Sequence, residues 1–150
     1  MRHARLLIFT LALCATVGLS TTANARTVAA AAGSPTSLTA GGTPIDDFAW
    51  LSTGIAAPFA SAGNARIWVI PTVIDTAGTK GFIVKGTPHS SLSCLLEQRG
   101  TVNQSVAIPV SPVGTNPAPV FMTVQAGNTV VVRCTFTSSS GRVLLVDHNS

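Results

Sequence analysis

The chain has 150 residues, which is enough to bury one hydrophobic core but hardly two. Only 9% of its residues are charged, against about a quarter in an average soluble domain. The formal net charge is +4, yet the basic residues are scattered, without a basic run or interleaved aromatic side chains, so the pattern argues against a nucleic-acid partner. A neutral, hydroxyl-rich composition of this kind fits the cell envelope or the extracellular space.

The first 25 residues have the three parts of a secretory signal peptide. The segment opens with basic residues, continues with an apolar run from Leu6 to Leu13 and ends in an Ala-x-Ala box at Ala25. The apolar run is too short to cross a bilayer as a helix. We therefore expect cleavage after Ala25 and a secreted or periplasmic protein, with no membrane span left after cleavage.

Residues 26–43 are dominated by Ala, Gly, Ser and Thr and contain too few large hydrophobic side chains to hold a packed structure. We expect a flexible N-terminal arm over this segment. The rest of the chain, residues 44–150, is expected to fold as a single domain.

The start of that domain, residues 43–59, has two interpretations. Pro44 is typical of a helix start, and Gly54 could end a short helix. The alternation of Phe48 and Trp50 fits a strand equally well. We slightly favour a short helix or an irregular turn.

From residue 66 onwards the pattern is β throughout, with turn residues between short apolar segments and no long helical period. Pro71 lies inside the first of these segments and implies an edge strand or a bulge. Residues 138–141 are typical of a hairpin loop. The pattern predicts an all-β fold, a small antiparallel β-sandwich of about seven strands. The expected strands cover residues 66–74, 81–85, 91–97, 102–108, 120–125, 129–137 and 142–146.

Two of these strands carry a cysteine at the centre of an apolar face. If the two inner faces meet across the core, Cys94 and Cys134 meet as well. They are the only cysteines left after signal cleavage, so an exported chain should join them in one disulfide. Cys14 follows Leu13, where a lipoprotein signal carries a small residue, so we interpret it as part of the apolar run. The apolar faces consist of Leu92, Cys94 and Leu96 in one strand and Val130, Val132, Cys134 and Phe136 in the other.

No catalytic, cofactor-binding or metal-binding motif is recognised. After cleavage only His89 and His148 remain, and neither lies in a metal-binding helix motif. A triad of His89, Asp75 and a serine, or a metal site made by the two histidines, can be assembled from distant residues, as in almost any sequence. We therefore expect no enzyme activity, no cofactor and no metal.

A few polar and aromatic residues have simple interpretations. Glu97 and Arg99 flank a turn and are expected to form a solvated pair, and Asp46 and Asp47 suit the first turn of a helix. Trp68 lies in an apolar run and is expected in the core. Trp50 is the candidate ligand contact, because sugar-binding modules stack pyranose rings on exposed tryptophans.

Three functional hypotheses follow. The preferred one is an exported, non-catalytic binding or structural module with a protein or glycan partner in the envelope. A signal, an N-terminal arm and a one-disulfide β domain resemble chaperone-usher pilins, which implies fibre assembly by strand exchange with residues 26–43 as the donor arm. The chain departs from that family because both cysteines lie in its C-terminal half. The third hypothesis is a small secreted enzyme, or a protease inhibitor that presents the proline-rich loop 109–119.

Overall fold

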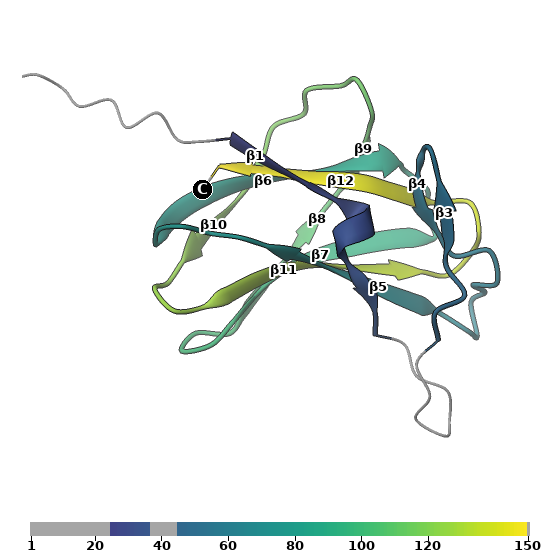
Figure 1. Cartoon of the computed structure of the whole chain (residues 1–150), viewed down its shortest axis with the longest axis horizontal. Helices are drawn as coiled ribbons and strands as arrows, with labels where there is room; N and C mark the ends of the chain where they lie inside the picture. The colour runs from purple at the N-terminus through teal and green to yellow at the C-terminus, as the bar shows by residue number, and fades with distance from the viewer. Residues whose placement is uncertain (1–24, 37–44, 150) are drawn as a thin grey trace, which may run out of the picture.

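The computed structural model describes residues 25–36 and 45–149, which form two β-sheets packed face to face (Figure 1). This confirms the predicted all-β sandwich with a largely antiparallel arrangement. Sheet A contains β1 (Ala25–Ala29), β3 (Ala49–Leu51), β4 (Gly54–Ala56), β6 (Gly78–Thr87), β9 (Val110–Pro112), β10 (Val120–Val124) and β12 (Arg142–Asn149). Sheet B contains β2 (Ser34–Pro35), β5 (Arg66–Thr72), β7 (Leu92–Arg99), β8 (Gln104–Ile108) and β11 (Thr129–Phe136).

The strand order places the longest strands at the centre of each sheet. In sheet A, β6 pairs with β12, β10 and the short parallel strand β9 lie beyond β6, and β1, β4 and β3 lie beyond β12. Sheet B has the order β2-β5-β11-β7-β8 and is antiparallel throughout. Pro71 lies in β5 beyond the two residues that pair with β2, so this part of β5 is an edge, as predicted.

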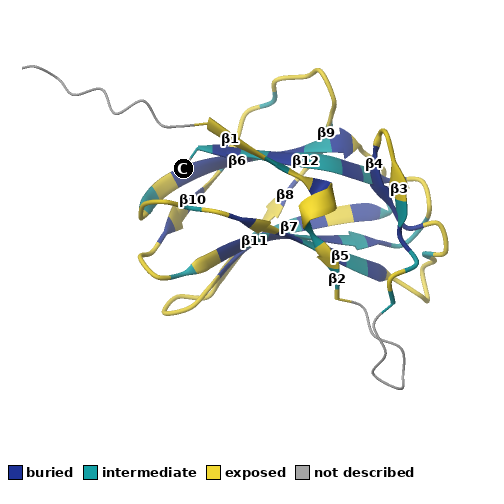
Figure 2. Ribbon diagram, in the orientation of Figure 1, coloured by how far each residue is buried: buried dark blue, intermediate teal, exposed yellow. Residues whose placement is uncertain are grey.

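The core lies between the sheets, where Figure 2 shows the buried positions of facing strands. Alternate side chains of each strand point inward, because successive residues of a strand face opposite sides of the sheet. The two apolar faces predicted around the cysteines are buried as expected. Sheet A supplies the opposing side chains, which include Phe82, Val84, Met122, Val143 and Val146.

The disulfide is present, but it does not cross the core. Cys94 and Cys134 lie directly opposite each other on β7 and β11, which are neighbours in sheet B, and their Cα atoms are 4.1 Å apart. The prediction that the two strands face each other from opposite sheets is therefore wrong. An alternating pattern shows which side chains share a face, and it carries no information about which sheet a strand joins.

The connection at residues 138–141 is not the predicted hairpin loop. It leads from β11 in sheet B to β12 in sheet A, so the chain crosses the end of the sandwich here. The backbone N–H and the hydroxyl of Thr137 both donate to the Ser91 carbonyl oxygen, which fixes the start of the crossing. Gly141 then lies so close to Leu92 that a Cβ atom would come within 2.5 Å of it.

The N-terminal segment differs from the flexible arm expected over residues 26–43. β1 pairs with β12, a single 3-10 turn, η1 (Ala30–Ala32), follows, and β2 pairs with β5, so the segment passes from sheet A to sheet B. Its small residues make room for Trp68, whose Nε1–H donates to the Ala30 carbonyl oxygen at 2.8 Å. At Gly33 a Cβ atom would lie 2.4 Å from that nitrogen. Residues 37–43 and the predicted signal residues 1–24 lie outside the described part.

Residues 49–56 form a strand pair, β3 and β4, in place of the favoured short helix. Trp50 lies opposite Ile55, and Val143 of β12 pairs with Ile55 on the other side. Gly54 has φ +122°, and a Cβ atom there would lie 2.4 Å from the Val143 carbonyl oxygen, so glycine permits the close approach of β4 to β12. Of the two interpretations of this segment, the strand is correct.

Candidate functional site

Trp50 lies on β3 at the edge of sheet A, and 58% of its surface is exposed. Its ring meets the ring of Trp68 edge-on, with centroids 5.4 Å apart and an interplanar angle of 84°. Trp68 is only 2% exposed, which confirms its predicted place in the core. Trp50 is therefore largely exposed to solvent and at the same time in contact with a buried ring.

The support continues inward as a chain of aromatic contacts. The Phe48 ring lies 4.7 Å from that of Trp68 and 5.8 Å from that of Phe136, measured between centroids. The hydrogen bond from Trp68 to the Ala30 carbonyl fixes the orientation of the central indole. Trp50 therefore lies at the exposed end of a series of ring contacts that reaches the core.

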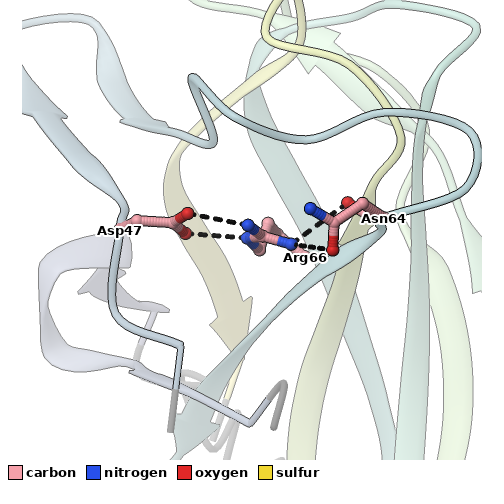
Figure 3. Close-up of polar contacts among 3 residues, drawn as sticks. All are labelled: Asp47, Asn64 and Arg66. Carbon is pink, nitrogen blue, oxygen red and sulfur yellow. Dashed lines mark hydrogen bonds and ion pairs between the residues drawn. The ribbon is translucent and has the colours of Figure 1, made fainter. Parts of the chain in front are cut away.

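A partly buried ion pair between Arg66 and Asp47 holds the segment that leads into β3 (Figure 3). Arg66 donates from Nε and Nη2 to the two carboxylate oxygens of Asp47, each at 2.8 Å, and from Nη1 to the backbone oxygen and the side-chain oxygen of Asn64. The hydrogen bonds from Arg66 lower the pKa of Asp47 and outweigh its partial burial. Asp47 was expected in the first turn of a helix, and that interpretation is wrong. The pair ties the residue before Phe48 to the start of β5.

The predicted pair of Glu97 and Arg99 forms, but Glu97 is buried and not solvated. Its carboxylate is almost fully buried on sheet B and accepts hydrogen bonds from Arg133 Nε at 2.8 Å and from Arg99 Nη2 at 3.0 Å. Burial alone would raise the pKa of Glu97, but the hydrogen bonds from the two arginines lower it below its usual range. Arg133 was missed because it is far from Glu97 in the sequence, and only the pairing of β7 with β11 brings it near.

His89 contacts a serine, but the triad considered from the sequence is not assembled. Its Nδ1 lies 2.6 Å from Ser91 Oγ and also accepts the backbone N–H of Ser91 at 3.2 Å, so this is a contact within one loop. Asp75 forms an ion pair with Arg26 at 2.6 Å in the loop before β6, whereas His89 lies in the loop after it. The full length of β6 separates the two side chains.

His148 is buried instead of lying at a solvated chain end. It is 3% exposed, its ring is stacked on Phe82, and neither ring nitrogen has a hydrogen-bond partner within the described residues. Burial lowers its pKa, and the charge of Arg26, which lies opposite it on β1, lowers it further. In the part of the chain that the structure describes, no group of three or more His, Cys, Asp or Glu side chains is placed to hold a metal.

The proline-rich loop 109–119 is partly built into the sandwich. Its first residues form β9, and a turn closed by hydrogen bonds from Thr115 to the Pro112 carbonyl oxygen presents Val113 to solvent. Two hollows of about 390 and 410 Å³ border the first part of this loop and share Pro88. A third, of about 230 Å³, lies over sheet A beside the exposed ring of Phe121.

Among the described residues, no helix is long and apolar enough to cross a membrane. Comparisons of the chain with protein-family models, with curated proteins and with solved structures found no match.

Proposed function

We propose that this protein is an exported, non-catalytic binding module that contacts a protein or glycan of the cell envelope or extracellular space through Trp50. The observation that carries the proposal is that Trp50 is largely exposed and yet held by ring contact with a buried tryptophan. Large, rigid aromatic side chains contribute much of the binding energy at recognition surfaces, because they bury area at a small entropic cost.

Export is supported by the leader-like first 25 residues. Ala25, after which we expect cleavage, is the first residue that the structure describes, and in β1 it pairs with Asn149 of β12. Cleavage would leave Arg26 at the N-terminus and keep the remaining pairs of β1 with β12. N-terminal sequencing of the protein recovered from outside the cytoplasm should give Arg26 as the first residue.

The binding test uses a glycan array and immobilised envelope polysaccharides, followed by titration of each ligand found. Replacing Trp50→Ala should weaken binding by about tenfold or more, because a central aromatic contact is removed. Phe59→Ala is the matched control, since Phe59 is also strongly exposed but lies outside β3. Equal affinity of the Trp50 variant and the unmodified protein would contradict the proposal, and so would turnover of hydrolase substrates that depends on His89.

A further inference from the structure

β8 forms one edge of sheet B and differs from the other strand edges. It pairs with β7 only, and its five residues, Gln-Ser-Val-Ala-Ile, include neither a charge nor a proline. An edge strand presents unpaired backbone N–H and C=O groups, so proteins usually protect it by shortness, charge, proline or a covering side chain. β8 has none of these protections, and most of its residues are exposed.

The other described edges are protected. β2 has two residues and includes Pro35, β3 has three residues, and β9 has three and ends in Pro112. β10 is as long as β8 and also uncharged, but the buried side chain of Gln98 covers part of its edge. Gln98 Oε1 accepts the backbone N–H of Gln125 at 2.7 Å, and Gln98 Nε2 lies 3.5 Å from the carbonyl oxygen of Thr123. β1, the remaining edge of sheet A, carries the charged Arg26.

The direction of the free backbone groups of β8 follows from the pairing. Opposite residues in antiparallel strands alternate between hydrogen-bonded pairs, with Cα atoms about 5.5 Å apart, and non-hydrogen-bonded pairs, about 4.5 Å apart. The separation of 4.1 Å between the Cα atoms of Cys94 and Cys134 identifies a non-hydrogen-bonded pair, so the backbone groups of Cys94 point toward β8. Its partner there is Ile108, and the alternation directs the N–H and C=O groups of Ser105 and Ala107 to the free edge.

Contacts on the far side of sheet B agree with this alternation. It directs the Ile67 carbonyl away from β11, and the backbone N–H of Thr36 donates to that oxygen at 3.0 Å. It also directs the nitrogen of Pro71, which has no hydrogen, away from β11. The same alternation therefore accounts for the directions of the backbone groups on both sides of the disulfide.

We propose that β8 is a self-association surface, on which β8 of a second copy pairs antiparallel about a two-fold axis at Val106. In this register Ser105 of each copy lies opposite Ala107 of the other. Each such pair exchanges two N–H···O=C bonds, so all four outward groups of Ser105 and Ala107 in each copy are paired. Val106 meets Val106 of the second copy as a non-hydrogen-bonded pair, and the uncharged strand brings no like charges together.

This arrangement is closed, because a two-fold contact uses the same patch on both copies. It joins the two B sheets into one continuous sheet, and no strand leaves its own domain. The contact is short, so it belongs with small, transient interfaces, and the dimer should form only at high protein concentration. A second copy is the favoured occupant because its own β8 matches the spacing and direction of the free backbone groups. No outward N–H or C=O group of Ser105 or Ala107 is then left unpaired.

Sedimentation velocity of the purified protein, from micromolar to near-millimolar concentration, tests the proposal. A reversible dimer is expected, and Ala107→Pro should raise its dissociation constant by about tenfold or more, because it removes an outward N–H from each copy. Ala107→Lys is a second variant that brings charge to the edge. Ser93→Lys is the control, since Ser93 is exposed on the face of β7 and not at the edge, and it should leave the dimer unchanged. A monomer at all concentrations, or a dimer that both Ala107 variants leave intact, would overturn the proposal.

Cysteine cross-linking tests the register separately. Val106→Cys should form an intermolecular disulfide in a glutathione buffer, because the two-fold axis brings the two positions to a Cα separation of about 4.5 Å. Ala107→Cys should not, because the two copies of residue 107 are offset along the strands beyond the reach of a disulfide. Cross-linking at position 107 without cross-linking at position 106 would show that the proposed register is wrong.

Discussion

Removing the disulfide should destabilise the domain strongly without changing its fold. Cys94 and Cys134 are 40 residues apart in sequence, and the bridge closes a loop of that length in the unfolded chain. The chain-entropy relation gives about 4 kcal/mol for such a loop, which is a large part of the roughly 5–15 kcal/mol that stabilises a typical domain. β7 and β11 remain joined by eight residue pairs without the bridge, so the folded sheet should persist.

The assay is urea unfolding of the double variant Cys94→Ala with Cys134→Ala. Unfolding is monitored through the change in tryptophan fluorescence as the buried Trp68 becomes exposed. The dependence of the unfolding free energy on urea should become steeper, because an unfolded chain without the cross-link exposes more surface. The corresponding double serine variant should be less stable still, since both cysteine side chains are buried and hydroxyls there would lack partners. A loss below about 1 kcal/mol would refute the loop-closure reasoning. Two thiols that alkylate in the folded protein would show that the bridge is absent.

Two further predictions concern buried polar side chains. Gln98→Leu should lower the free energy of unfolding in urea by about 1–3 kcal/mol, because the Thr123 carbonyl and the Gln125 N–H lose their partner. Gln104→Leu is the control: Gln104 is exposed, so this change should alter stability by less than about 0.5 kcal/mol. His148 has a pKa lowered in the folded state below 6.5, so the unfolded chain binds the proton more readily, and stability should fall as the pH drops through that value. In thermal unfolding measured between about pH 7.5 and 5, His148→Phe should remove this loss of stability, whereas His89→Phe should keep it. If the His148 variant kept the same pH dependence, the loss would not come from His148.

The strands from residue 66 onwards could be predicted because their signal is local. Alternation with a period of two depends on neighbouring residues only, and it identified the buried face of β11. The strand partners depend on contacts distant in sequence. For this reason the sequence placed Cys94 and Cys134 on opposite sheets, although it paired them correctly.

The segments that were missed have no local apolar pattern of their own. β1 and β2 contain few large hydrophobic residues and are held by pairing with β12 and β5, and η1 between them packs against Trp68. Arg66 and Asp47 are 19 residues apart, and nothing in the spacing of the two charges indicated an ion pair. Trp50 was identified as a candidate from its residue type, but its exposure and its support by Trp68 depend on the β3–β4 pairing.

The two proposed surfaces lie on strands at different edges, and together they have a consequence for binding. Trp50 is on the edge strand β3 of sheet A, whereas β8 is the edge of sheet B next to β7. Gln98 of β7 contacts Thr123 of the opposite edge strand, β10. A dimer formed through β8 would therefore carry two Trp50 surfaces far from the contact. A polymeric ligand that spans both would bind more tightly than a single repeat, because the second contact becomes intramolecular. In such an assay, Trp50→Ala should weaken single-repeat binding and leave the dimer intact, while Ala107→Lys should abolish only the gain from the polymer. If the Ala107→Lys variant keeps the higher affinity for the polymer, the multivalent binding does not depend on β8 pairing.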